Sequence, residues 1–219
     1  MDINIVTLGI TNTYIIKGKN GYIMVDAGEL RKEKSFLRQV KNLGIDPKKI
    51  NLIIITHAHF DHIGSLADIK NMCGCPVLIH PYEADILARG EVVIPPGTNT
   101  AGSVMSTMGK GLKFLFRFKP VTAELRCEGE FDLRPYGVNG RVIPTPGHTK
   151  GSLSVVLDDG RAMVGDLAMN FAFQKTNYPI FAEMPEEVYK SWDKIKKAGA
   201  ETIYPAHGAC FPVSNLIEK

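Results

Sequence analysis

The most constraining feature of the sequence is the heptapeptide THAHFDH at residues 56–62, which directly follows the apolar run NLIII at residues 51–55. The run is short, rich in isoleucine and uninterrupted, so it predicts a buried strand. Residues 63–72 have helical spacing and predict a helix. The histidine and aspartate side chains of the heptapeptide are therefore expected on a loop between a strand and a helix.

This heptapeptide indicates a metal site, because few structural needs call for the pattern His-x-His-x-Asp-His. In an extended loop His57 and His59 project to the same side, whereas Asp61 and His62 are adjacent and should leave the backbone in different directions. One ion cannot easily collect all four side chains. The alternative is a solvated turn, which is disfavoured because three of the six histidines of the chain fall in this heptapeptide.

Three later stretches place one ligand-type residue at the end of an expected strand, beside glycine or proline. These residues are His148 in PTPGHT, Asp166 in VGD and His207 in YPAHG. Backbone turns at such positions and exposes the side chain to a cleft. Each stretch alone is a weak indication, since each is also a common turn sequence.

Taken in order with the heptapeptide, these stretches match the motif series of the metallo-β-lactamase superfamily from Asp26 to Gly208. The sequence resembles most closely the hydroxyacylglutathione hydrolase (glyoxalase II) type of that superfamily. The resemblance implies an α+β fold, a four-layer αββα sandwich with the metal site at one edge of two packed sheets.

The resemblance also implies a role for each ligand. The first divalent ion would be held by His57, His59 and His148, the second by Asp61, His62 and His207, and Asp166 would bridge the two. Asp61 and Asp166 are the expected catalytic residues, because they would hold the ions and orient the water, and Asp61 is a candidate acceptor for its proton. Asp26 would orient a ligating histidine or simply end a strand.

The number of ligands supports two ions independently of the resemblance. Seven side chains are too many for one tetrahedral zinc ion, but they suit two ions that share a carboxylate and a water. Zinc is the expected metal, and histidine and carboxylate ligands also accept iron or manganese.

The predicted function is hydrolysis of an ester, thioester or lactone carbonyl of a small molecule by metal-bound hydroxide. One alternative is a mononuclear iron persulfide dioxygenase, which belongs to a different reaction class. Another is a metal-binding protein without catalytic activity. Structural zinc sites are usually rich in cysteine, and none of the four cysteines falls in the ligand series, which disfavours the last alternative.

Composition excludes several other classes. A net charge of +3 is too small to indicate nucleic-acid binding. The first residues show no basic and apolar regions of a signal peptide, and the apolar runs are shorter than a membrane span. The four cysteines form no Cys-x-x-Cys pair. We therefore expect a cytoplasmic protein that binds neither nucleic acid nor membrane.

A chain of 219 residues is expected to form one domain over residues 1–219. Within it, residues 91–119 differ in composition. A helical apolar stripe, edged by basic residues, includes Val104, Met105, Met108 and Leu112. The segment is expected to act as a lid over the site or as a contact in a homodimer.

The order of the expected elements suggests two halves, each with a sheet and covering helices. Phe171, Phe173, Tyr178 and Phe181 are candidates for the wall of an apolar acyl pocket, and core packing would explain them equally well. Strands are expected at residues 3–8, 12–17, 22–25, 51–55, 76–79, 129–133, 141–144, 152–157, 161–165 and 202–204, and helices at 31–43, 63–72, 81–88 and 185–198.

Overall fold

The computed structural model describes residues 2–217 and contains two sheets. The apolar run before the heptapeptide forms strand β4 (Ile50–Ile54), which lies inside the first sheet. Leu52 and Ile54 face the second sheet, whereas Ile53 and Ile55 face the helices on the other side. Both faces of the strand are therefore buried. A strand buried on both faces reads as a continuous apolar run, without alternating polar residues.

The first sheet has six strands in the order β1-β2-β3-β4-β5-β6. The pairs β1–β2 and β2–β3 are antiparallel, and each later pair is parallel. The parallel strands end at the same edge, so the loops that follow β3, β4 and β5 emerge side by side. The other strands of this sheet are β1 (Ile3–Leu8), β2 (Thr11–Gly18), β3 (Gly21–Val25), β5 (Val77–Ile79) and β6 (Leu125–Arg126).

The second sheet has the order β12-β11-β10-β9-β8-β7, and only the pair β10–β11 is parallel in the part of the chain described. Strands β10 and β11 therefore deliver their following residues to one edge. The strands are β7 (Phe131–Asp132), β8 (Gly140–Pro144), β9 (Leu153–Leu157), β10 (Arg161–Gly165), β11 (Thr202–Pro205) and β12 (Phe211–Pro212).

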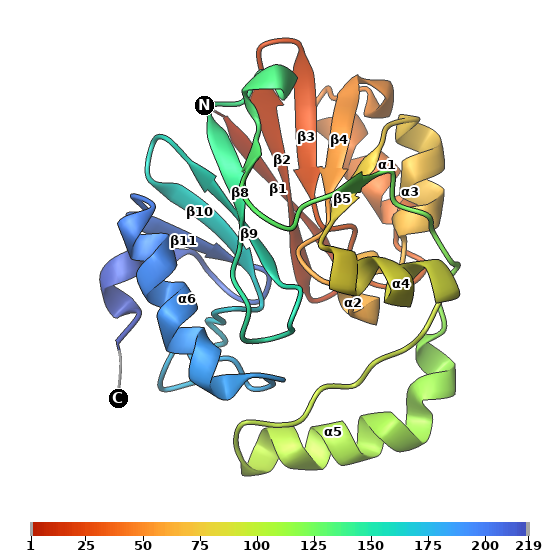
Figure 1. Ribbon diagram of the computed structural model, residues 1–219. Helices are drawn as coiled ribbons and strands as arrows, with labels where there is room; N and C mark the ends of the chain where they lie inside the picture. Colours follow the sequence, from red (N-terminus) through yellow and green to blue (C-terminus); the bar gives the residue numbers. More distant parts are fainter. Residues whose placement is uncertain (1, 218–219) are drawn as a thin grey trace.

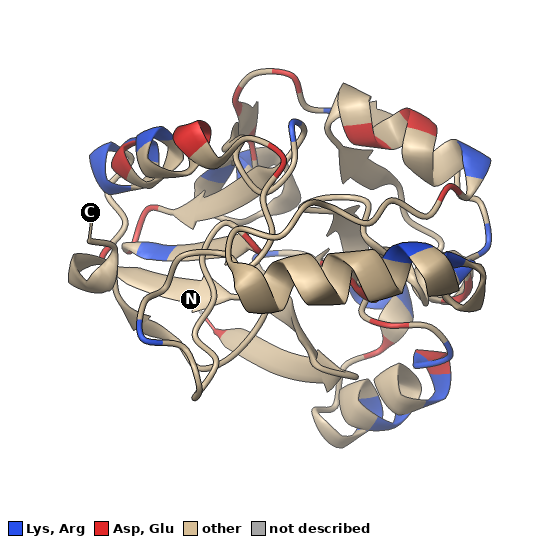
Figure 2. Cartoon of the chain, turned by 90° about the horizontal axis from the view of Figure 1, so that it is seen from below, with Lys and Arg blue, Asp and Glu red and all other residues tan. Residues whose placement is uncertain are grey.

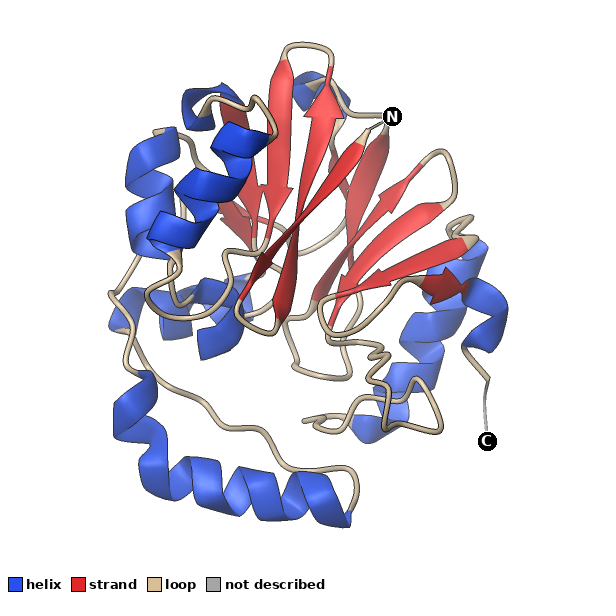
Figure 3. Ribbon diagram, turned by 180° about the vertical axis from the view of Figure 1, so that it is seen from behind, coloured by secondary structure: helices blue, strands red, loops and turns tan. Residues whose placement is uncertain are grey.

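Helices cover the outer faces of both sheets, which gives the four layers of an αββα sandwich (Figures 1 and 3). The longer helices are α1 (Glu33–Asn42), α3 (Leu66–Cys73), α4 (Pro81–Arg89), α5 (Thr100–Leu112) and α6 (Pro185–Lys197). The short ones are α2 (Phe60–Ile63) and the 3-10 turns Pro47–Lys49, Lys113–Phe116, Arg134–Tyr136 and Val213–Asn215.

Three apolar clusters separate these layers. The first includes Phe36 of α1 and Ile69 of α3 against the first sheet. The second lies between the sheets, where Val25 and Val155 are both fully or almost fully buried. The third includes Trp192 of α6 against the second sheet. This arrangement confirms the predicted α+β class and the four-layer sandwich.

The helix expected at residues 63–72 is divided into two, α2 and α3, and begins earlier. The break falls at Gly64, whose backbone N–H donates to the carbonyl oxygen of Gly28 at 2.9 Å. A Cβ on Gly64 would lie 2.3 Å from the backbone nitrogen of Leu30. Close contact with the loop after β3 therefore interrupts the helix. The two-residue strands β6 and β12 were also not expected, because so short a strand leaves no periodic pattern.

Helix α5 lies across the edge of the sandwich from which the loops emerge, as Figure 2 shows from below. Its outward side chains are unusually apolar, and Val104 and Met108 are 55% and 61% exposed. The segment therefore does not pack its whole stripe on the core of its own chain. Its roles as a lid or as a dimer contact stay predictions. Among residues 2–217, no helix combines the length and hydropathy that a membrane span needs.

Candidate metal centre

The structure brings the seven predicted ligands together at one edge of the sandwich. They come from the loops after β4, β8, β10 and β11, and from α2. They form two groups, each with ligand atoms within 4.8 Å of one another. The first group is His57, His59 and His148, and the second is Asp61, His62, Asp166 and His207.

In the first group, three imidazole nitrogens converge. His148 Nε2 lies 3.1 Å from His57 Nε2 and 2.9 Å from His59 Nδ1. All three side chains are buried. Imidazole nitrogens with unprotonated lone pairs repel one another at such distances, whereas a cation held between them would bind all three.

In the second group, two histidines face two carboxylates. Asp166 Oδ1 lies 3.2 Å from His62 Nε2 and 3.2 Å from His207 Nε2. Asp61 Oδ2 lies 3.2 Å from His207 Nε2 and 3.9 Å from His62 Nε2. Asp61 and His62 were expected to point apart, but their ends converge. Asp61 Oδ2 contacts His207 Nε2, and Asp26 Oδ2 contacts Nδ1 of His62, on the opposite side of the ring from Asp61.

Asp166 lies between the two groups. Its Oδ2 is 3.5 Å from His148 Nε2 of the first group, and its Oδ1 faces the histidines of the second. One carboxylate oxygen therefore faces each group. The predicted bridging role requires such an arrangement.

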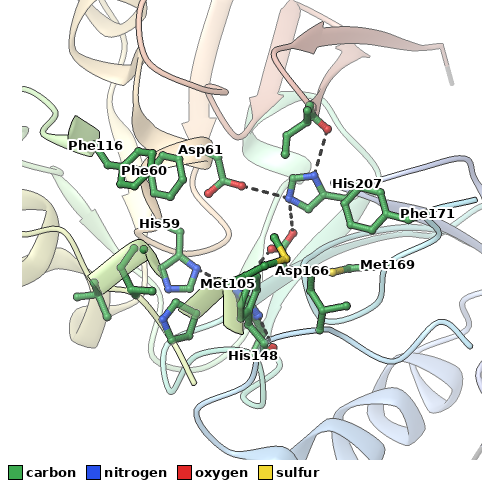
Figure 4. A pocket seen from close by; sticks show the side chains of 17 residues that line it. His59, Phe60, Asp61, Met105, Phe116, His148, Asp166, Met169, Phe171 and His207 are labelled. Atoms are coloured by element: carbon green, nitrogen blue, oxygen red, sulfur yellow. Dashed lines mark hydrogen bonds and ion pairs between the residues drawn. The ribbon is translucent and has the colours of Figure 1, made fainter. Parts of the chain in front are cut away.

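The ring nitrogens that face away from the groups are held by fixed partners. His148 Nδ1 donates to the carbonyl oxygen of Phe181 at 2.8 Å, and His207 Nδ1 donates to that of Ile10 at 3.1 Å (Figure 4). A carbonyl oxygen only accepts, so each Nδ1 carries the hydrogen. The Nε2 lone pair of each ring is thereby left for a metal ion.

Asp26 orients both the loop and a histidine. Its Oδ1 accepts the backbone N–H of Thr56 at 2.8 Å, and its Oδ2 lies 2.9 Å from His62 Nδ1. Asp26 is buried and has a φ of 61°, in the left-handed region that few non-glycine residues adopt. The contacts favour the orienting role over that of a simple strand end.

The donor atoms fit divalent cations. His62 Nε2 is buried without a hydrogen-bond partner among the described residues. Leaving such an atom unpaired costs about 1–3 kcal/mol, more where the group is charged. Histidine nitrogens and carboxylate oxygens are ligands for zinc, iron and manganese alike.

The two groups differ in proton affinity. Burial lowers the pKa of His57 well below its usual range and that of His59 to about 3. Burial alone would also lower the pKa of His207, but the charge of Asp166 and hydrogen bonds to Asp166 and Asp61 raise it to about 10. In the metal-free protein at neutral pH, the first group is therefore neutral and His207 is protonated.

This difference predicts that the two groups lose metal at different pH. The pKa of His62 and that of His207 are both raised by the neighbouring carboxylates, so a cation entering the second group must displace a proton from each, and its affinity should fall more than tenfold per pH unit as the pH is lowered. His59 takes up no proton until the pH approaches about 3. Metal content after dialysis at falling pH should therefore pass through a plateau of one ion per chain. A simultaneous loss of both ions would contradict this prediction.

Glu83 of α4 is a site residue that the sequence did not reveal. Its Oε2 accepts the backbone N–H of Ala58 at 2.9 Å, between two ligands of the first group. Its Oε1 accepts the N–H of Gly151 at 3.2 Å, in the loop that carries His148. The side chain is buried, and burial raises its pKa. Glu83 thus connects two loops that carry metal ligands through hydrogen bonds to their backbones. No sequence motif indicates this role.

We expect Glu83→Gln to weaken metal binding by the first group about 10- to 100-fold, the range for partners that orient ligands. The amide NH2 of glutamine cannot accept one of the two backbone hydrogen bonds. Competition with a chromophoric chelator would measure the affinity. Glu124→Gln is the matched control, because Glu124 Oε2 also accepts a backbone N–H, that of Val77 at 2.9 Å, away from the metal groups. Equal effects of both variants would contradict the role.

The remaining histidine and the cysteines lie outside both groups. His80 is buried, and its Nδ1 accepts the backbone N–H of Tyr82 at 3.2 Å at the start of α4. It therefore has a structural role. The four cysteines are free thiols, and none belongs to either metal group.

Comparison with known proteins agrees with this geometry. The family model of the metallo-beta-lactamase superfamily matches residues 6–207. A probable metallo-hydrolase of Methanocaldococcus jannaschii is 28% identical over 200 residues, which cover 90% of this chain and 87% of that protein. A hydroxyacylglutathione hydrolase of Idiomarina loihiensis is 25% identical over 190 residues, which cover 86% of this chain and 57% of that protein.

Among solved structures, the fold is similar to that of an archaeal metallo-beta-lactamase superfamily protein from Sulfolobus tokodaii. The TM-score is 0.71 with 22% sequence identity, and the match covers 98% of this chain and 82% of that one. At this level of identity the likeness concerns the fold alone.

Proposed function

The chain belongs to the metallo-β-lactamase superfamily and is a metal-dependent hydrolase, and on that premise we propose that it cleaves an ester, thioester or lactone with two divalent ions. The observation that carries the proposal is the position of Asp166, which turns one carboxylate oxygen toward each group of ligands. A single shared carboxylate is how a protein holds two ions close enough to act on one substrate.

The seven ligands would hold two cations, which when bound would polarise the carbonyl of the substrate and activate a water molecule. Asp61 is placed to accept the proton of that water, because it lines the cavity above the ligands. Burial alone would raise its pKa, but the charge of His62 and the hydrogen bond with His207 lower it below its usual value. Asp61 is therefore ionised at neutral pH, as a proton acceptor and a metal ligand must both be.

The lining of the cavity supports water as the nucleophile. Among the described residues that line it there is no serine, threonine, cysteine or lysine. The cavity has a volume of about 230 Å³, which suits the reacting part of a small molecule. We therefore propose a small-molecule substrate.

The test combines metal content with a substrate panel. Freshly purified protein should contain two ions per chain by elemental analysis, and it should hydrolyse members of a panel of esters, thioesters and lactones without oxygen. A single iron together with oxygen consumption on persulfides would support a dioxygenase. Retained metal with no turnover on any substrate would support a metal-binding protein without activity.

A further inference from the structure

We propose that the acyl group of the substrate is an uncharged, apolar chain that lies in the cavity between the metal ligands and α5. This inference rests on the proposed function, since it names the class of acyl group that the same centre would act on.

The polar lining of the cavity consists entirely of metal ligands. His59, Asp61, His148, Asp166 and His207 lie on one side, and every other lining residue is apolar. Figure 4 shows Met105 among the ligands, with Phe60 and Phe116 beside Asp61 and Phe171 beside His207. The polar partners of a substrate carbonyl are therefore all at the metal ligands. The rest of the acyl group would contact apolar side chains.

The apolar wall is built by the segment that crosses the edge of the sandwich. Met105 and Gly109 are one turn apart on α5 and both line the cavity. A Cβ on Gly109 would lie 3.2 Å from the side chain of Ile94. Glycine at this position therefore lets α5 pack closely against the extended segment that precedes the helix. Phe116, just beyond α5, stacks on Phe60 with ring centroids 4.3 Å apart. This aromatic contact connects the segment after α5 to the residue between His59 and Asp61, at one end of the cavity.

Two of the four aromatic candidates from the sequence contribute to this wall. Phe171 and Phe181 line the cavity, and Phe171 also stacks on the ring of His207 with centroids 5.4 Å apart. Tyr178 instead packs against Trp192 in the core under α6, and Phe173 is 76% exposed. The wall beside His207 is therefore apolar close to the reacting centre.

The wall also lacks charge of either sign. No lysine or arginine lines the cavity among the described residues, and its only carboxylates are the ligands Asp61 and Asp166. A carboxylate or phosphate on the acyl group would lose its hydration there without gaining a partner. A methylene group would instead leave water for hydrocarbon, which is favourable. The cavity thus selects for uncharged acyl groups.

The first experiment is a chain-length series of acyl thioesters with one common thiol, assayed with the metal-loaded protein. We expect kcat/KM to rise by up to about fourfold per added methylene from acetyl through butyryl to hexanoyl. The rise should end at medium length, because the cavity is smaller than the roughly 300–1,000 Å³ of pockets for drug-sized ligands. A glutaryl thioester should react at least about a hundredfold more slowly than pentanoyl. Equal rates along the series would overturn the inference.

A matched pair of variants on α5 tests the location. Met105→Lys places a cation in the cavity, and it should lower kcat/KM for hexanoyl at least about tenfold while raising that for glutaryl. Met108→Lys is the control, because Met108 is 61% exposed on the same helix and does not line the cavity. Both positions are more than half exposed, so neither substitution should unfold the protein. The same response from both variants would mean that the acyl chain does not lie in this cavity.

Binding separates this inference from the proposed hydrolysis. Calorimetry of the metal-loaded protein with butanoate, hexanoate and glutarate should show affinity that rises with chain length and is weakest for glutarate. Length-dependent binding without any hydrolysis would overturn the proposed reaction and support the apolar cavity. Hydrolysis with no length dependence in either rate or binding would overturn the cavity and support the reaction.

Discussion

Replacing Asp166 by asparagine is expected to lower kcat/KM for the best thioester or lactone by at least about 1,000-fold. Asp166 turns one carboxylate oxygen toward each group of ligands, at 3.5 Å from His148 Nε2 and 3.2 Å from His207 Nε2. An asparagine amide keeps the shape but brings one neutral oxygen in place of two charged ones. When several residues act together in catalysis, replacing one of them removes most of the activity of the enzyme.

The loss should be accompanied by a lower metal content, measured by elemental analysis of the purified variant. Asp193→Asn serves as the control, because Asp193 is a partly exposed aspartate of α6 that pairs with Lys196 at 3.8 Å and belongs to neither metal group. This control should keep both ions and full activity. If Asp166→Asn retained two ions and more than about a tenth of the activity, the shared role of Asp166 would be wrong.

Removal of the metal is expected to lower the free energy of unfolding by about 4 kcal/mol for each ion lost, relative to protein at a free metal concentration of about 1,000 times the Kd of that ion. For a chain of this length, that change lowers Tm by roughly 8–16 °C. The structural reason lies in the convergent ligands. Without a cation, His148 Nε2 stays 3.1 Å from His57 Nε2 and 2.9 Å from His59 Nδ1, all buried.

Thermal unfolding followed by circular dichroism, before and after dialysis against a chelator, measures this effect. Added zinc should restore Tm, which distinguishes loss of metal from irreversible damage. The Asp166→Asn variant should respond less to the chelator, because it has less metal to lose. An unchanged Tm in the wild-type protein would mean that the folded and unfolded chains bind metal equally well.

The local sequence predicted the helices and strands that have a periodic or uninterrupted apolar pattern. Strand β4 and helix α6 were both expected, because the first is buried on two faces and the second on one. The break at Gly64 was not, since it results from contact with backbone around residue 30, far away in sequence. The four-layer order followed from the family resemblance and not from these patterns.

The sequence also contained every residue that forms the two metal groups. Histidine and aspartate at strand ends are visible in the sequence, because the chemistry of a ligand depends on the type of its side chain. The partners that hold those ligands are less visible. The carbonyl oxygens of Ile10 and Phe181 belong to backbone that any residue carries, so no motif could indicate them. Glu83 likewise acts through two backbone N–H groups on separate loops.

The sequence by itself therefore determined the set of metal ligands, the apolar strands and the amphipathic helices. Only the tertiary structure decided the pairing, because distances between residues such as His57 and His148 depend on how two sheets pack. The folded chain also decided that α5 crosses the edge of the sandwich that carries the metal ligands, and that its Met105 lines a cavity with no lysine or arginine among the described lining residues. The physical reason is that an apolar stripe specifies burial, while the partner that buries it is set by the packing of the whole chain.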